Sequence, residues 1–194
     1  MANSKLNNLN KVKIMTVSAL LSALGILIPM TFPSIRLEPA SYTLASHVPI
    51  FLAMFISPLT AAFVAAVTTF GFFVAGFPIV IVLRALSHLI FSLTGAFILK
   101  KKNQLLTSFK NNALFNFAVS LIHAAAEVAV VTYFYRVSGM SSAYYEKGYF
   151  FSVFILVGIG TLIHSMIDFS IAVTVWLPLQ HIISIPANAK IKIK

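Results

Sequence analysis

The sequence predicts an all-α integral membrane protein: a six-helix bundle with both termini in the cytoplasm. Of the 194 residues, 59% are hydrophobic and only 9% are charged. The apolar residues fall in several long runs, and the charged residues lie mostly at the ends of these runs. A chain of this length has room for about six helices of roughly 20 residues and for no separate soluble domain. We therefore expect one multi-pass domain over residues 1–194 in the cell membrane.

The apolar runs predict helices near residues 14–32, 43–57, 59–76, 78–99, 112–135 and 150–178, the second of them short. Basic residues precede the first run, as in a signal peptide, but no small-residue cleavage site follows it, so we expect a retained helix. Pro58 separates the second helix from the third, and Gly76 and Pro78 separate the third from the fourth. Because proline removes a backbone donor, these are tight turns. Helices two to four should therefore form a compact antiparallel packet.

The distribution of basic residues predicts the orientation in the membrane. If the N-terminus is cytoplasmic, the inner segments hold ten lysines: Lys5, Lys11, Lys13, Lys100, Lys101, Lys102, Lys110, Lys190, Lys192 and Lys194. The outer loops then hold only Arg36, Arg136 and Lys147. Cytoplasmic loops carry the excess of Lys and Arg, so both termini are expected inside. The net charge of +10 is thus a topology signal and not a nucleic-acid footprint, and the C-terminal tail is expected to be a loose basic end.

Six ionisable residues lie inside the apolar runs, in pairs spaced four residues apart. The pairs are Arg84 with His88, His123 with Glu127, and His164 with Asp168. Each pair shares one face of its helix. Ionised groups are costly in hydrocarbon, so these faces should converge on the interior of the bundle. Counted from the outer helix ends, Arg84 and Glu127 both lie about 10 Å deep, whereas Asp168 lies deeper and its membership of the same site stays open.

Three interpretations of this cluster are possible. The groups could be ion pairs, for instance Arg84 with Glu127, that only set the register of the helices. They could instead line a polar cavity that binds a small solute, which we favour because intramembrane charges usually mark a site or pathway. A metal site is the third possibility, but no HxxxH or HExxH pattern is present and Arg84 would repel a cation. We therefore expect no metal and no cofactor in this chain.

The segment "PSIRLEPASYT", residues 33–43, joins the first two predicted helices on the outer side. It carries Arg36, Glu38, Tyr42 and two prolines, so it could be a stiff lid over the cavity, although an ordinary solvated loop is equally compatible. His47 and His181, near helix ends, are expected to be capping or packing residues.

The chain has no GxxxxGK[ST] phosphate loop, so any ATP-driven transport must be powered by partners. The first predicted helix contains "ALLSA", an AxxxA pattern at Ala19 and Ala23. With six helices, an extended first outer loop and the outward polar cluster, the chain resembles the substrate-binding S components of energy-coupling factor (ECF) vitamin transporters. The resemblance spans nearly the whole chain. It implies a vitamin-binding subunit and no enzyme activity.

The resemblance also implies partners. In that family, a transmembrane T component and two cytosolic ATPases act on the S component, and ATP is used by those partners. Ala19 and Ala23 would form the smooth face that contacts the T component, because small residues let a foreign helix approach closely. Arg36, Glu38 and Tyr42 would belong to the gate that closes over the vitamin.

The substrate is expected to be a small carboxylate, because an arginine fork suits a carboxylate. The expected binding residues are Arg84, His88, His123, Glu127, His164 and Phe77. The stretches "ASYTLASHVPIFLAMF" and "GFPIVIVLRALSHLIF" resemble the pantothenate S components most, so pantothenate is favoured and niacin is the alternative.

Two other functional classes stay open. A stand-alone proton-coupled carrier could use the same buried carboxylates. A membrane-embedded enzyme could use His123 with Glu127, or His164 with Asp168, as an acid–base pair, but it would need a nucleophile or a metal that the sequence does not provide.

Overall fold

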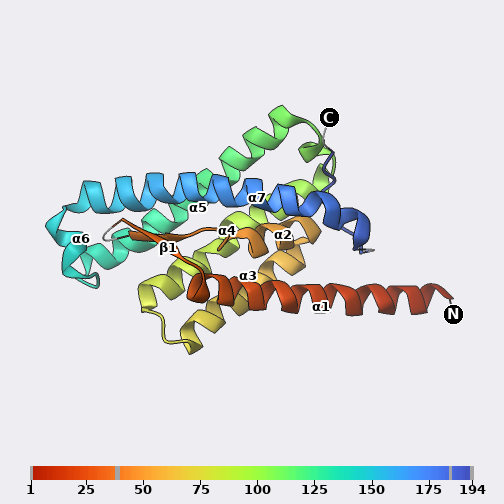
Figure 1. The fold of residues 1–194 in the computed structure, drawn as a ribbon, viewed down its shortest axis with the longest axis horizontal. Helices are drawn as coiled ribbons and strands as arrows, with labels where there is room; N and C mark the ends of the chain where they lie inside the picture. Colours follow the sequence, from red (N-terminus) through yellow and green to blue (C-terminus); the bar gives the residue numbers. More distant parts are fainter. Residues whose placement is uncertain (1, 38–39, 184, 193–194) are drawn as a thin grey trace.

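The computed structural model describes residues 2–37, 40–183 and 185–192. Six of its segments correspond to the six predicted helices (Figure 1): α1 (Ala2–Thr31), α2 (Val48–Ile56), α3 (Pro58–Val74), α4 (Ile79–Lys101), α5 (Phe109–Arg136) and α7 (Gly160–Ile182). A π-helical segment, η2 (Phe150–Ile159), runs directly into α7. Two short pieces complete the helical structure, the 3₁₀ turn η1 (Leu105–Thr107) and the helix α6 (Ser142–Glu146).

The prediction of a helical membrane protein is confirmed. Within the described ranges, four helical segments are long and apolar enough to cross a bilayer: Asn8–Thr31, Ile79–Lys101, Phe109–Arg136 and Phe150–Ile182. α3 has 17 residues and α2 only nine, so these two are short for a full span. The structure therefore supports four full-length spans, where the sequence predicted six helices.

The short helix α2 lies at the centre of the bundle. All of its residues are buried, and a helix that is apolar all round is expected to be buried all round. Its aromatic rings pack against neighbouring helices: Phe51 contacts Phe91 of α4 and Phe169 of α7, and Phe55 contacts Trp176. Because α2 is enclosed by the other helices, the residues just before it are carried into the interior.

The turn between α2 and α3 has the tight form that Pro58 predicts. Ser57 is extended, its hydroxyl accepts a hydrogen bond from the Thr60 amide at 3.1 Å, and Pro58 begins α3. This is a standard N-cap, which satisfies an amide that has no partner within the helix. Gly76, with φ +78°, provides the left-handed residue between α3 and α4. α3 packs against α2 and α4, so the predicted packet of three helices is present.

The segment between α1 and α2 is a short β-hairpin, a local feature that was not expected within the otherwise helical chain. β1 (Ser34–Leu37) and β2 (Ala40–Thr43) pair antiparallel, with Ile35 opposite Tyr42. The hairpin reaches toward the end of the bundle where α6 lies, away from the N-terminal end of α1 (Figure 1). Glu38 lies outside the described residues, and of Arg36 only the backbone is described.

The lysine-rich segments gather at the other end of the molecule. The start of α1, the α4–α5 connection and the end of α7 lie toward this end in Figure 1. This arrangement fits the charge asymmetry that predicted the topology. The cytoplasmic location of both termini stays a prediction.

The C-terminal segment does not form the loose tail expected from its composition. Ala189 and Ile191 are buried, and the amides of Asn188 and Ala189 donate to the Phe55 carbonyl at the end of α2. The indole of Trp176 donates to the Ala189 carbonyl at 3.2 Å. The tail therefore covers the lysine-rich end of the bundle, and the Trp176 side chain is buried in the core.

Candidate functional site

A cavity of about 160 Å³ lies between the hairpin and the helices α1, α3, α4, α5 and α7. Its polar lining comes from the segment before α2 and from four helices: Tyr42, Thr43, Ser46, His47, Thr68, Arg84, His88, Glu127, Thr161 and His164. Its apolar lining includes Ile50, Ile81 and two phenylalanines, Phe72 and Phe77, whose rings are stacked with centroids 4.7 Å apart. The cavity thus combines a group of ionisable side chains with an aromatic wall.

Glu127 of α5 connects three helices. Its Oε2 accepts a hydrogen bond from Nη2 of Arg84 on α4 at 2.7 Å and another from the Thr161 hydroxyl on α7 at 2.8 Å. Its Oε1 faces Nε2 of His88 at 3.6 Å and Nε2 of His123 at 3.5 Å. The two oxygens therefore have different surroundings, one fully hydrogen-bonded and the other facing imidazole nitrogens.

Asp168 of α7 holds the segment that precedes α2. Its carboxylate accepts hydrogen bonds from the backbone amides of Ala45 at 2.8 Å and His47 at 2.9 Å, and it lies 3.1 Å from Nδ1 of His47. Nε2 of His164, one turn earlier on α7, lies 3.3 Å away. Because ionised Asp168 can only accept, Nδ1 of His47 carries the proton. Asp168 does not line the cavity and acts by positioning His47.

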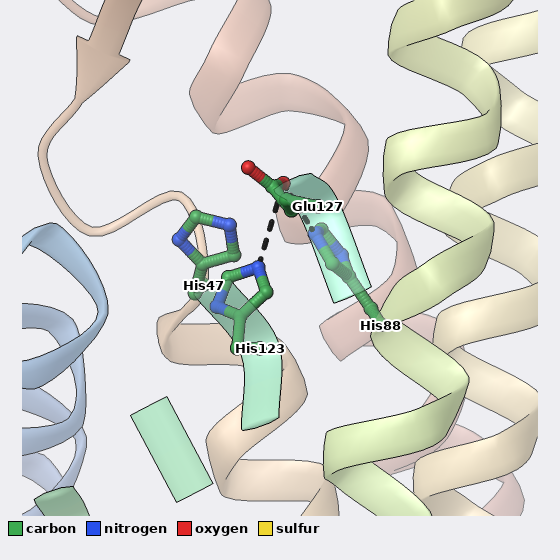
Figure 2. Close-up of side chains that lie close together, drawn as sticks. All are labelled: His47, His88, His123 and Glu127. Carbon is green, nitrogen blue, oxygen red and sulfur yellow. Dashed lines mark ion pairs between the residues drawn. The ribbon is translucent and has the colours of Figure 1, made fainter. Parts of the chain in front are cut away.

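His47 lies at the centre of the cluster. Its ring centroid is 4.9 Å from that of His88, 4.7 Å from that of His123 and 5.0 Å from that of His164. Figure 2 shows the rings of His47, His88 and His123 gathered beside the Glu127 carboxylate. Four of the five histidines of the chain thus meet in one place, contributed by α4, α5, α7 and the turn before α2.

Two overlapping groups in this cluster have the composition of metal ligands. His47, His88, His123 and Glu127 form one group, and His47, His164 and Asp168 form the other. Within each group, the candidate ligand atoms all lie within 4.8 Å of one another.

Comparison with known proteins identifies the family. The chain is 44% identical over 163 residues to a niacin transporter, NiaX, of Lactococcus lactis subsp. cremoris (strain MG1363). The match covers 84% of this chain and 72% of the transporter. The chain belongs to the family of this transporter. No protein-family model and no solved structure matches it.

This relationship supports the resemblance to ECF vitamin transporters that the sequence indicated. Together with the four apolar helices, it identifies a multi-pass protein of the cell membrane. It does not support the pantothenate-like specificity, because the relative is a niacin transporter.

Most of the predicted binding residues meet at the cavity. Arg84, His88, Glu127, His164 and Phe77 line it. His123 is fully buried directly behind them and reaches the site through Glu127.

The predicted gate and partner residues can be placed only in part. Tyr42 of β2 lines the cavity, whereas Glu38 and the side chain of Arg36 are outside the described part. Ala19 and Ala23 are exposed on α1, away from the cavity.

Several site residues were not predicted. His47 was expected to cap or pack at the start of α2, but its side chain makes no cap hydrogen bond and lies at the centre of the site. Thr161, Ser46 and Phe72 also line the cavity. The only signal in the sequence for His47 was its place between the outer segment and an unusually short helix, which implies that the chain turns back inside the bundle.

Arg84 combines two of the sequence-based interpretations. It is paired with Glu127, as a register-setting ion pair would be, and it also lines the cavity. Its Nε is buried and has no hydrogen-bond partner within the described chain. Because an arginine has five N–H donors, the pair with Glu127 leaves donor capacity for a ligand.

Tyr42 connects the hairpin to the π-helical segment η2. Its hydroxyl donates to the carbonyl of Leu156, within the π-helical segment η2. Burial raises the pKa of Tyr42 to about 12, so the hydroxyl stays protonated and remains a donor at physiological pH. Irregular helical segments often occur at functional sites, and here η2 ends just before Thr161.

Proposed function

We propose that this chain is the substrate-binding S component of an ATP-driven ECF importer and that its substrate is niacin. The observation that carries the proposal is the 44% identity to a niacin transporter over 84% of the chain. The cavity adds the chemistry that such a ligand needs, namely a cationic fork beside an aromatic wall.

Niacin is a flat aromatic ring with one carboxylate and one ring nitrogen. The guanidinium of Arg84 suits the carboxylate, because charge-assisted hydrogen bonds from arginine are strong and directional. The stacked rings of Phe72 and Phe77 offer an apolar surface for the pyridine ring. The hydroxyl of Ser46 also lines the cavity and can donate to the ring nitrogen.

Niacin replaces pantothenate as the favoured substrate. Both vitamins are carboxylates, so Arg84 does not discriminate between them. Pantothenate is a flexible chain with hydroxyl and amide groups, whereas the stacked pair of Phe72 and Phe77 suits a planar ring better. The relationship to a niacin transporter points in the same direction.

The energising partners are proposed on the same basis. The sequence has no phosphate loop for ATP, so ATP-driven transport by this chain would require ATPase subunits and a membrane subunit that couples them to it. We assign this role to a T component and two cytosolic ATPases, as in other ECF importers.

Ligand binding by the purified chain in detergent tests the proposal. Isothermal titration calorimetry with niacin, nicotinamide and pantothenate is expected to give the tightest binding for niacin. Nicotinamide has the same ring without the negative charge, so its affinity should be lower by about 10-fold or more, because a hydrogen bond to a charged group contributes about 1.5–3 kcal/mol.

Substitution of the arginine completes this test. Arg84→Ala should weaken niacin binding by roughly 10- to 100-fold for the same reason. The control is Arg136→Ala, which removes an exposed arginine at the end of α5 and should leave the affinity unchanged. Tighter binding of pantothenate than of niacin, or equal niacin affinity in the Arg84 and Arg136 variants, would contradict the proposal.

A further inference from the structure

Beyond the vitamin, the cluster in Figure 2 has the geometry of a metal centre. We propose that His47, His88, His123 and Glu127 form a four-ligand site for a divalent transition metal of the Zn²⁺ class, beside the vitamin cavity. The proposal does not rest on the identity of the vitamin. From the sequence no metal is expected, because it contains no local metal-binding motif. The motif is absent because the four ligands come from three separate segments of the chain.

The distances fit coordination better than hydrogen bonding. Oε1 of Glu127 lies 3.6 Å from Nε2 of His88 and 3.5 Å from Nε2 of His123. An N–H···O hydrogen bond spans about 2.7–3.2 Å, so these separations are too long for one. Two ligand atoms of a tetrahedral zinc ion, each about 2.0–2.1 Å from the metal, lie roughly 3.4 Å apart. The spacing therefore leaves room for an ion between the carboxylate and the two imidazoles.

Two ring nitrogens that face this point have no other partner. Nε2 of His123 and Nε2 of His88 are buried and make no hydrogen bond within the described residues. The His123 side chain is 0% exposed. A buried polar atom without a partner is destabilising, so native proteins rarely leave one without a compensating interaction. A metal ion bound to both nitrogens would provide that interaction.

The outer contacts hold the ligands in the orientation that a metal site needs. Nδ1 of His47 lies 3.1 Å from the Asp168 carboxylate, which keeps the proton on Nδ1 and leaves Nε2 as the metal-binding nitrogen. Nδ1 of His123 lies 3.1 Å from the Ser165 hydroxyl. Metal-binding histidines almost always hydrogen-bond through their other nitrogen in this way.

The Glu127 carboxylate is oriented in the same manner. Arg84 and Thr161 both bond to Oε2, so Oε1 is the oxygen left for an ion. Hydrogen bonds of this kind are typical of metal-binding carboxylates.

The charge of Arg84 does not prevent cation binding. Two buried carboxylates, Glu127 and Asp168, lie in the same cluster as the single guanidinium, so the group carries one net negative charge with neutral histidines. A divalent ion changes this to one net positive charge, and a bound carboxylate ligand then neutralises it. Since net charge is costly inside a membrane protein, the metal and an anionic vitamin should favour each other's binding.

The test measures metal binding without vitamin. The purified chain is treated with a chelator, exchanged into metal-free detergent buffer and titrated with Zn²⁺ by calorimetry. One equivalent is expected to bind to the wild-type chain and to His181→Ala, which removes an exposed histidine outside the cluster. His88→Ala and His123→Ala should each weaken binding by at least 100-fold. Failure of the wild-type chain to bind Zn²⁺, or full binding by both variants, would overturn the proposal.

Two further measurements cover the case in which a ligand variant does not fold. Ser165→Ala leaves all four ligands in place and removes only the partner of His123, so it should weaken Zn²⁺ binding by about 10- to 100-fold. Co²⁺ bound to the wild-type chain should give the intense visible absorption of a tetrahedral ion. A weak octahedral spectrum, or an unchanged affinity in Ser165→Ala, would count against the site. Because no vitamin is present, these results are independent of niacin binding.

Discussion

At the scale of single residues, the turn before α2 determines where His47 lies. Ala45 has φ 67°, a left-handed conformation that is unfavourable for a residue with a side chain. The amide of Ala45 donates to Asp168, and the amide of His47 donates to the other oxygen of the same carboxylate. One buried carboxylate thus holds a strained turn and orients the histidine at the centre of the site.

This strain predicts an unusual response to glycine. Ala45→Gly should leave the free energy of unfolding unchanged or raise it by up to about 1 kcal/mol, because glycine adopts positive φ without steric cost. Ala53→Gly, in the middle of buried α2, should lower it by about 1 kcal/mol or more. Thermal unfolding of the two variants in detergent compares these effects. A larger loss of stability at Ala45 than at Ala53 would contradict the assigned turn.

At the scale of elements, the C-terminal segment packs into the core of the bundle, although its lysine-rich composition is typical of a solvated tail. The side chain of Gln180 on α7 donates to the Ile191 carbonyl at 2.7 Å and accepts from the Ile191 amide at 3.1 Å. This pair of hydrogen bonds ties the tail alongside the end of α7. The amide of Lys190 also donates to the Asn103 carbonyl in the α4–α5 connection.

The consequence is a measurable contribution to stability. Gln180→Ala should lower the free energy of unfolding by about 1–3 kcal/mol, since each net hydrogen bond contributes about 0.5–1.5 kcal/mol. Gln104→Ala, at an exposed glutamine in the α4–α5 connection, should have little effect. Unfolding of both variants in detergent, followed by the fluorescence of buried Trp176, tests the difference. Equal stability of the two variants would show that the tail contacts are dispensable.

At the scale of the whole molecule, the site and the exposed alanines of α1 lie on different surfaces. The cavity lies between the helices and the hairpin, whereas Ala19 and Ala23 are exposed and do not line it. This separation suits a subunit that binds its ligand alone and meets its energising partners through another face. Small side chains let a partner helix approach closely, with little side-chain ordering.

Bulky substitutions at this face should separate binding from transport. Ala19→Leu and Ala23→Leu should retain niacin affinity within about two-fold, because neither residue contacts the cavity. Both should reduce ATP-driven uptake in proteoliposomes that contain the complete importer. Ala118→Leu, at an exposed alanine of α5, is the control and should transport normally. Normal uptake by both α1 variants would remove the proposed contact, and uptake by the chain alone under a pH gradient would favour a proton-coupled carrier.

The sequence predicted the class of the protein and part of the site. Long apolar runs identified the helices to within a few residues at most boundaries, apart from the start of α1. The four-residue spacing of the buried ionisable residues predicted that their side chains would meet inside the bundle. Arg84 and His88 do lie beside Glu127 in the structure. Helical periodicity made this possible, because it depends only on local geometry. The β-hairpin was not predicted, since its strands are short and the segment contains two prolines, Pro33 and Pro39.

The sequence alone determined that the protein lies in a membrane, that it is helical, and which face of each helix is polar. It could do so because the cost of exposing polar groups to lipid acts on every segment separately. Only the tertiary structure decided that α2 is enclosed, that Asp168 holds the turn before it, and that His47 joins His88, His123 and Glu127. These contacts bring together residues far apart in the chain, so they depend on how the helices pack against one another, which no local pattern encodes.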